Sequence, residues 1–353
     1  MGYDTPIGRF GANWSKGTAL AAVWASYLVA GIAGVAVAFV VGEFEGLKDA
    51  EILKFAGLIQ ATAGDFVATT VVWFAGILFN NSSLYDPYWS VFTPVAYCFW
   101  VAMAQQANRD VPLERTVLVG ISCWFWAIRL TTNWMRDWRG LSSEDFRYIL
   151  IRETFQKNGY PKSLYWFVGS FSAVMVFPTV QVLLGSIAAF VAVSFGVKSD
   201  NANGFNFVDI LATLLCVSAA TIQFIADEQM RKFRNAGHPR EKVMESGLWY
   251  YSRHPNYFGE LLFWFGIYVH ALATDPLKFW WTGIGFVAML LLFVFASVPL
   301  MEKRQLKRRP EFARIMATTS MLVPMWRKKN ELLDPIMVQA DQQHDQVREA
   351  SAR

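Results

Sequence analysis

Charged residues are scarce in this 353-residue sequence: Asp, Glu, Lys and Arg make up only 17% of it. Soluble globular proteins carry about a quarter charged residues, and apolar runs recur here from one end of the chain to the other. Together these features exclude a soluble domain held by a single membrane anchor. The formal net charge of +4 is modest, so the composition predicts no nucleic-acid partner.

Cysteine and histidine are scarce as well. Cys98, Cys123 and Cys216 lie inside apolar runs without a CxxC spacing, so we interpret them as small hydrophobic residues rather than disulfide partners or metal ligands. The four histidines are scattered and form no HExxH or other close ligand set, which predicts that the protein binds no metal. Haem or quinone ligation by His270 stays open, but one histidine is weak evidence for it.

Apolar and ring-bearing side chains are abundant instead, at 54% hydrophobic and 16% aromatic residues. About 20 mostly apolar residues cross the hydrocarbon core of a bilayer. A segment inside lipid must satisfy its own backbone hydrogen bonds, which favours helices. We therefore predict an all-α integral membrane protein with about eight transmembrane helices, and at least seven and at most nine. The predicted spans are 18–41, 56–79, 88–105, 113–133, 163–195, 206–227, 258–273 and 279–300.

One membrane helical domain, residues 18–325, is predicted to contain all of these spans. It follows an N-terminal inner-side segment, 1–17, and precedes a polar C-terminal tail, 326–353. The first apolar run is too long for a cleavable signal, so we expect it to be a retained span. Pro178 lies inside the long fifth span, where a kink or a split would change the number of spans.

The distribution of basic residues gives an independent test of this topology. With eight spans, the N-terminus, the even-numbered loops and the C-terminus share one side of the membrane, and that side holds 25 of the 32 Lys and Arg residues. Loops rich in Lys and Arg stay on the inner side. We therefore expect both termini to face the cytosol, or the matrix of a mitochondrion. The endoplasmic reticulum, the mitochondrial inner membrane and a bacterial plasma membrane all stay open.

The most specific string runs from Tyr251 to Glu260 and leads directly into a span. Pro255 suits the first turn of a helix, where its missing N–H costs nothing. The free N–H groups of a helix start, together with the charge of Arg253, attract phosphate. Asn256 and Glu260, four residues apart, lie on one helix face and can hold amide and hydroxyl groups of a ligand. The alternative is a cap that stops the helix from entering lipid.

A second polar group lies at the inner end of the sixth span. Gln223, Asp227, Arg231 and Arg234 follow one another at intervals of four, four and three residues, so they form one stripe along a helix. The amide and the acid lie deeper and the bases nearer to water, which is the order in which a dinucleotide needs them. The alternative is an ordinary ion pair between Asp227 and Arg231 at the end of a span.

Further ionisable residues accompany the fourth span. Arg129 lies within the apolar run, where an ionisable side chain faces a polar cavity or a partner unless it snorkels to the interface. The stretch 144–148 adds Asp145, Arg147 and Tyr148. The basic stretch that begins at Glu302 is, taken alone, an anchor to anionic lipid.

Two acidic residues lie nearer the start of the chain. Asp86 precedes a proline in the loop 81–89, where Asp commonly caps a turn. Asp65 lies in the middle of the second span, deeper than any other acid. It is expected to be either a cavity residue or half of a buried pair.

These strings resemble those of a known family. RHPNYFGE at 253–260, preceded by Gly-Leu-Trp at 247–249, is similar to the C-terminal signature of the steroid 5α-reductase superfamily. RHPNYFGE alone is not specific, because sterol C14-reductases share it and isoprenylcysteine carboxyl methyltransferases carry a looser version. The resemblance covers roughly residues 80–325 and points to the branch of multi-span oxidoreductases with a 5α-reductase C-terminal-like domain. Its other motifs, in the family order, are 223–234, SSEDFRY at 142–148, NSSLYDPYW at 81–89 and PLMEKRQLKRRPEF at 299–312.

The resemblance implies an NADPH site. Asp227, Arg234, Asn256 and Glu260 fall where steroid 5α-reductases contact NADPH, and Gln223 falls where they place an asparagine. Asp86 lies near the position of their substrate-polarising glutamate. Near 294–302, where those enzymes place Arg, His and Tyr, this chain has Val294, Val298 and Glu302. The cofactor is therefore expected to be held differently there, and a steroid substrate is not supported.

The predicted function is NADPH-dependent reduction of an activated C=C bond in a lipid of the sterol, polyprenyl or fatty type. In this hypothesis Arg253, Arg234 and Arg147 hold phosphates, and Asp86 or Tyr257 is the catalytic acid. The full set of predicted cofactor-binding residues is Arg129, Asp145, Arg147, Tyr148, Gln223, Asp227, Arg234, Arg253, His254, Asn256, Tyr257, Glu260 and Glu302.

Two other functions stay open. The chain could be a non-catalytic accessory subunit of a large membrane complex, such as a respiratory complex, that retains the reductase fold. It could also be an isoprenylcysteine-type methyltransferase, although the sequence lacks an acidic, Gly-rich adenosyl-binding segment. The expected partners are membrane lipids, a lipophilic substrate and, for the accessory subunit, other membrane proteins. The reductase hypothesis requires polar side chains from separated stretches to meet in one pocket at the inner mouth of the bundle.

Overall fold

A computed structural model of the chain describes residues 10–48, 53–196 and 204–328. Within these ranges the secondary structure is helical, and an isolated bridge joins Ser252 and Ser320. The predicted tail 326–353 lies outside the described residues except for 326–328, and the predicted N-terminal segment 1–17 is described only from residue 10.

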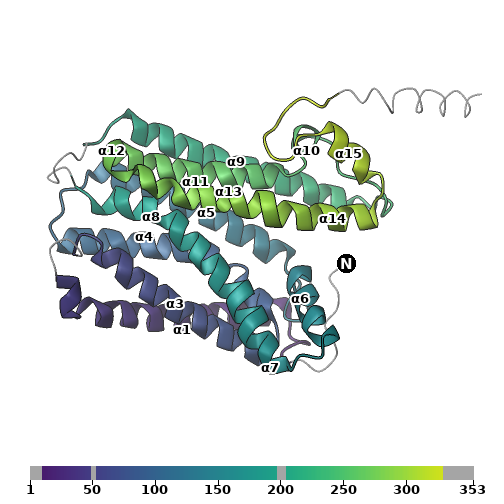
Figure 1. Cartoon of the computed structure of the whole chain (residues 1–353), viewed down its shortest axis with the longest axis horizontal. Helices are drawn as coiled ribbons and strands as arrows, with labels where there is room; N and C mark the ends of the chain where they lie inside the picture. The colour runs from purple at the N-terminus through teal and green to yellow at the C-terminus, as the bar shows by residue number, and fades with distance from the viewer. Residues whose placement is uncertain (1–9, 49–52, 197–203, 329–353) are drawn as a thin grey trace, which may run out of the picture. The chain divides into compact units, whose positions relative to one another are not determined.

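Each predicted span coincides with one helical stretch of the described chain. Five stretches are long and apolar enough to cross a membrane: Lys16–Gly42, Ala56–Phe79, Lys162–Ser194, Phe207–Asn235 and Pro276–Arg308. The prediction of an all-α membrane protein is therefore confirmed. The long helices are α1 (Lys16–Gly42), α3 (Ala56–Phe79), α4 (Tyr88–Gln106), α5 (Leu113–Asp137), α8 (Phe177–Ser194), α9 (Phe207–Asn235) and α11 (Pro255–Thr274), as Figure 1 shows.

Two of the spanning stretches are composite helices. The stretch Lys162–Ser194 joins α7 (Lys162–Leu164), the π-helical segment η3 (Tyr165–Val176) and α8. The stretch Pro276–Arg308 joins α12 (Pro276–Phe279), η4 (Trp280–Gly283), α13 (Ile284–Leu292), the π-helical η5 (Phe293–Ser297) and α14 (Val298–Arg308). Shorter elements are η1 (Glu45–Lys48), η2 (Ser82–Tyr85), α6 (Phe146–Lys157), α10 (Leu248–Tyr251) and α15 (Phe312–Thr318).

Pro178 lies in the first turn of α8, directly after the wide turns of η3. A proline inside a helix lacks an N–H and crowds the carbonyl four residues earlier. The π turns upstream change the pairing of those carbonyls, so that the helix continues past the proline. The region 163–195 is therefore one helix rather than two.

The chain divides into two compact units. Unit 1 comprises residues 1–220 and 261–291, and unit 2 comprises residues 221–260 and 292–353. The unit boundaries fall within α9, within α11 and at the end of α13.

In unit 1, α1 packs closely along α3 (Figure 1). The two helices meet at Gly34 and Gly64, where a Cβ on Gly34 would lie 2.7 Å from the carbonyl oxygen of Gly64. Small residues at such a crossing let two helix backbones approach within van der Waals contact, which is how helices associate inside lipid. Most of the remaining surface of α1 is apolar and exposed, as expected of a lipid-facing helix.

In unit 2, α11 begins at Pro255, as its sequence predicts. The segment after α15 runs beside the chain that leads into α11. The N–H of Arg253 donates to the carbonyl of Ser320 (2.9 Å), and the N–H of Met325 donates to the carbonyl of Tyr251 (2.9 Å). Glu245 pairs with Arg314 of α15 (3.0 Å) and with Arg327 of the segment that follows it (2.8 Å).

Candidate active site

In unit 1, the loop after α3 is built by a buried asparagine. Asn81 caps η2 by accepting a hydrogen bond from the N–H of Ser83 (2.8 Å). Its amide donates to the carbonyls of Leu141 and Ser143, both at 2.9 Å. Because a side-chain amide both donates and accepts, this one residue ties the turn of η2 to the chain that leads into α6.

Asp86 and Tyr148 meet at this junction. The hydroxyl of Tyr148, in the first turn of α6, donates to Oδ1 of Asp86, which directly follows η2. Asp145 caps α6: its carboxylate accepts from the N–H of Arg147 (2.9 Å) and pairs with the guanidinium of Arg147 (2.8 Å). The N–H of Asp145 in turn donates to the hydroxyl of Ser83 (2.7 Å). We call Asp86, Asp145, Arg147 and Tyr148 the acid cluster.

The surroundings of Asp86 favour its neutral form. Burial raises the pKa of its carboxyl to about 7, and the nearby negative charge of Asp145 acts in the same direction. The charge of Arg147 and hydrogen bonds from Tyr148 and Ser83 act against this shift. A carboxyl with a pKa near 7 is a suitable proton donor at neutral pH. Arg147 and Asp145 are partly exposed, with side-chain exposures of 46% and 27%, so the cluster is open to water or to a ligand.

An ion pair between Glu144 and Arg152 lies next to the residues of the acid cluster along the chain. Glu144 accepts from the N–H of Ser82 (2.8 Å) and from the guanidinium of Arg152 (2.9 Å). That guanidinium also lies 4.8 Å above the ring of Tyr165, in η3. The sequence analysis did not identify Arg152 or Ser83 as site residues. The strings SSEDFRY and NSSLYDPYW contain the residues of both contacts, Glu144 with Ser82 and Asp145 with Ser83, but a sequence gives no pairing between them.

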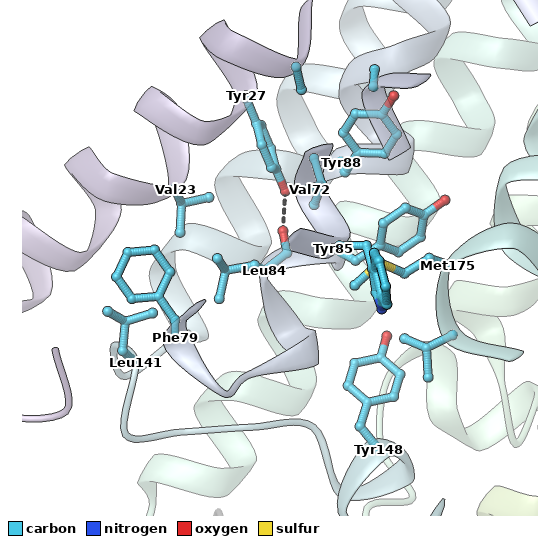
Figure 2. Close-up of a cluster of buried hydrophobic side chains, with 14 of the residues drawn as sticks. Val23, Tyr27, Val72, Phe79, Leu84, Tyr85, Tyr88, Leu141, Tyr148 and Met175 are labelled. Atoms are coloured by element: carbon cyan, nitrogen blue, oxygen red, sulfur yellow. Dashed lines mark hydrogen bonds between the residues drawn. The ribbon is translucent and has the colours of Figure 1, made fainter. Parts of the chain in front are cut away.

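Tyrosines surround the same region of unit 1, as Figure 2 shows. The hydroxyl of Tyr27 donates to the carbonyl of Leu84 in η2 (2.5 Å), the dashed line in Figure 2. The hydroxyl of Tyr85 meets that of Thr179 at 2.6 Å. These contacts fix η2 to α1 and α8, so the backbone that carries Asp86 is held from several sides.

In unit 2, α9 and the start of α11 bring two predicted cofactor residues together. The amide of Asn256 donates to Oδ1 of Asp227 at 3.4 Å. Gln223 lies one turn from Asp227 on α9 and is 1% exposed, and Glu260 lies one turn from Asn256 on α11 and is also buried. Arg234, in the last turn of α9, is exposed. We call Gln223, Asp227, Asn256 and Glu260 the amide–acid cluster.

Other predicted cofactor residues in unit 2 contact one another instead. Arg253 pairs with Glu302 (2.7 Å) and donates to the carbonyl of Met316 (2.6 Å). His254 lies 3.0 Å from the same carboxylate and stacks on Tyr257, which stacks on Phe293. The charge of Arg253 is thus engaged by a carboxylate and a backbone carbonyl, which weakens its predicted role in holding phosphate.

Two ionisable residues of the predicted spans, Arg129 and His270, lie in unit 1 and belong to neither cluster. Arg129 is buried along α5. His270 is fully buried in α11, with Nε2 at 3.2 Å from the hydroxyl of Ser122 and 3.5 Å from that of Thr213. Cys98, Cys123 and Cys216 are free thiols, as their apolar surroundings predict.

The predicted site residues therefore form two groups, one in each unit. Unit 1 holds the acid cluster, and unit 2 holds the amide–acid cluster and the contacts of Arg253 with Glu302. The prediction that the separated stretches share one pocket stays a prediction.

Comparisons with known proteins agree with this description at the level of the family. An uncharacterised protein of Schizosaccharomyces pombe is 24% identical over 266 residues, which are 69% of this chain and 73% of that protein. No solved structure matches the chain. Residues 72–319 match the family described as proteins of unknown function, DUF1295, a family associated with steroid 5α-reductase-like proteins. The match covers well over half of the sequence and includes both clusters, so the chain belongs to the DUF1295 family.

Proposed function

We propose that this protein is a steroid 5α-reductase-like, NADPH-dependent membrane reductase that saturates an activated C=C bond in a lipid. The observation that carries the proposal is the hydrogen-bonded pair of Asp86 and Tyr148, an acid with a pKa near neutrality that is built into a membrane protein. The family match over 72–319 includes this pair and supports the proposal.

The residues of the amide–acid cluster fit NADPH. Asp227 and Asn256 offer a carboxylate and an amide that suit ribose hydroxyls and a carboxamide. Nε2 of Gln223 is buried and has no hydrogen-bond partner among the described residues. A buried donor left unsatisfied is costly, and a ligand oxygen would satisfy it. The exposed guanidinium of Arg234, one turn beyond Arg231 and two turns beyond Asp227, suits a phosphate group.

NADPH would supply a hydride to the β-carbon of the activated double bond. The acid pair supplies the matching proton: Tyr148 donates a hydrogen bond to the substrate carbonyl, and protonated Asp86 delivers its proton to the α-carbon. The proton lost from Asp86 returns from water through the exposed side of the acid cluster. Because Asp86 must be protonated, we expect turnover to fall as pH rises above about 7.

The substrate is proposed to be a lipid because the chain is a membrane protein with extensive apolar helices. We further propose that both termini face the cytosol or the mitochondrial matrix, since most Lys and Arg residues lie on that side of an eight-span topology.

Binding of NADPH to the purified full chain in detergent tests the proposal, with nicotinamide fluorescence as the readout. We expect Asp227→Ala, Arg234→Ala and Glu260→Ala each to weaken binding by roughly tenfold or more, because each removes a charged hydrogen-bonding group. Lys232→Ala is the matched control: Lys232 is an exposed base on the same helix, and its loss should leave binding unchanged.

Turnover then separates the enzyme from its alternatives. With an enone-bearing lipid as acceptor, Asp86→Asn and Tyr148→Phe should abolish NADPH oxidation without changing NADPH affinity. Binding of S-adenosylmethionine in place of NADPH would favour the methyltransferase. Failure to bind either cofactor would reject the reductase and favour an accessory subunit of a membrane complex.

A further inference from the structure

Three large apolar side chains are exposed together after α15, in unit 2. Val323 is 56% exposed, Met325 is 60% exposed and Trp326 is 79% exposed. We call these three residues the apolar tip. Exposed apolar side chains that are close together on a surface mark a contact with another apolar surface. The tip therefore needs an occupant.

The backbone that carries the apolar tip is held in place. The segment that follows α15 runs beside α10 (Figure 1), and the N–H of Met325 donates to the carbonyl of Tyr251 at 2.9 Å. The hydroxyl of Ser252 donates to the carbonyl of Leu322 at 2.7 Å, and the side chain of Leu322 is buried. The ring of Trp326 meets that of Tyr251 edge to face at 5.2 Å. The tip thus belongs to an ordered segment whose apolar side chains stay exposed.

These contacts also place the tip near the membrane surface. Tyr251 lies four residues before Pro255, the first residue of α11, and α11 leads into the predicted span 258–273. An extended chain covers at most about 3.6 Å per residue, so Tyr251 lies within about 14 Å of the start of α11. Because Met325 is hydrogen-bonded to Tyr251, the tip lies close to the level at which α11 enters the bilayer.

The chemistry of this surface suits a bilayer interface. Tryptophan settles at the level of the lipid headgroups, and Lys328, two residues after Trp326, is an exposed base. Lys303 and Lys307 are further exposed bases of unit 2, at the end of the spanning stretch Pro276–Arg308. Basic side chains beside a bilayer attract anionic headgroups. A stable protein interface uses about 20 to 30 residues on each side, so three side chains favour lipid over a protein partner.

We propose that the apolar tip is an anchor to an anionic membrane surface. Val323, Met325 and Trp326 enter the headgroup region, and Lys328 contacts anionic headgroups. Because the tip is hydrogen-bonded to the chain that leads into α11, it holds the start of that helix at a fixed depth. The anchor needs neither NADPH nor a substrate, so it stands independently of the reductase.

Spin labels on the full chain in vesicles test the anchor. A nitroxide is attached to Val323→Cys, Met325→Cys or Glu241→Cys in a chain whose other cysteines are replaced by alanine. Val323 and Met325 are exposed, so the label should leave the fold intact. In vesicles of phosphatidylcholine and phosphatidylglycerol, we expect oxygen to reach the labels at 323 and 325 and a water-soluble nickel complex to be kept from them. Glu241, an exposed residue of a polar loop in unit 2, is the control, and nickel should reach it.

The contribution of charge is measured in the same vesicles. Lys328→Gln should lower the ratio of immersed to free label at 325 by about fivefold, which corresponds to about 1 kcal/mol for one base at an anionic surface. In vesicles of phosphatidylcholine alone this ratio should not change. An equal effect of Lys328→Gln in both kinds of vesicle would contradict the assignment of Lys328 to anionic headgroups.

Three results would overturn the anchor itself. Nickel could reach 323 and 325 as readily as 241, which would place the tip in water. The labels could be shielded from both oxygen and nickel until the chain is truncated after Lys328, and the occupant would then be the chain's own C-terminal segment. Shielding from both together with spin–spin broadening between labels would instead show that a second copy of the chain covers the tip.

Discussion

Asp65 and Asp86 are two carboxyls of unit 1 with different surroundings. Asp65 has one partner, a tyrosine, and lies within a spanning helix. Asp86 lies between η2 and α4, receives the hydroxyl of Tyr148 and is influenced by both a neighbouring acid and a neighbouring base. Exposed charges flank Asp86, so it can exchange its proton with water, whereas Asp65 lies within the spanning helix and accepts from Tyr88.

The raised pKa of Asp86 predicts how stability depends on pH. Its pKa rises from an ordinary 3.8 to about 7 in the folded chain, so the folded state holds a proton that the unfolded state releases. Stability therefore falls as pH rises from about 4 to about 7. Each pKa unit corresponds to about 1.4 kcal/mol, so the loss amounts to about 2–4 kcal/mol.

Asp86→Asn removes this titration, and its melting temperature in detergent should exceed that of the wild type at pH 8 but not at pH 4. The difference between the two proteins isolates Asp86, because every other group titrates in both. A constant difference across this pH range would show that Asp86 is not buried as described.

The sequence was sufficient to identify single site residues within motifs. It did not show which side chains those residues contact. The strings containing Asp86 and Tyr148 were both identified, yet 62 residues separate the two side chains, and no periodicity relates residues on different helices. Arg253 shows the converse. Its position before a helix start predicts phosphate binding, but the carboxylate that engages it, Glu302, lies in another helix.

At the scale of elements, helices α5, α9 and α11 are joined within unit 1 by a buried ion pair. The guanidinium of Arg115 contacts Asp209 at 2.8 Å and the carbonyl of Ala273 at 3.0 Å. Both charged side chains are fully buried. Asp209 also accepts from the N–H of Asn206 (3.1 Å), which completes the cap of α9. The pair thus neutralises two buried charges, and it also satisfies a helix start through Asp209 and a helix end through Arg115.

We expect Arg115→Met to destabilise the chain by about 3–5 kcal/mol, because it leaves Asp209 buried without its cation. The double variant Arg115→Met with Asp209→Leu should recover much of this loss, since it removes both charges together. Glu114→Gln, at an exposed neighbour, should change stability by less than about 0.5 kcal/mol. Thermal unfolding in detergent measures all three, and a double variant no more stable than Arg115→Met would contradict the ion-pair account.

Elements were predictable where one local signal was sufficient. The long apolar runs gave the spanning helices, and Pro255 marked the first residue of α11. The short elements η2 and α6 were not predicted, although they carry the acid cluster. Their ends depend on Asn81 and Asp145, which are common turn and cap residues and acquire their role only through contacts with distant backbone.

At the scale of the whole molecule, the sequence predicts sidedness from charge alone. Among the described residues five helices can cross a membrane by length and composition, and the longest two begin at Lys162 and Pro276. The predicted sidedness depends on whether the number of spans is even or odd. The region 162–194 is one helix and counts as one span, so it leaves the predicted number unchanged. Basic residues on short loops are costly to translocate. The proposed topology therefore assigns every loop to the inner or the outer side of the membrane.

Single cysteines introduced into a chain without Cys98, Cys123 and Cys216 test that statement. Lys157→Cys and Lys242→Cys lie on exposed positions of the proposed inner side, and Glu45→Cys and Asn108→Cys lie on exposed positions of the proposed outer side. In intact cells a membrane-impermeant maleimide should label only the outer pair if the chain is in a plasma membrane, and permeabilisation should add the inner pair. Labelling of Lys157→Cys together with Glu45→Cys in intact cells would require an even number of crossings between them. In that case the eight-span topology, and the inner location of the proposed cofactor residues with it, would have to be abandoned.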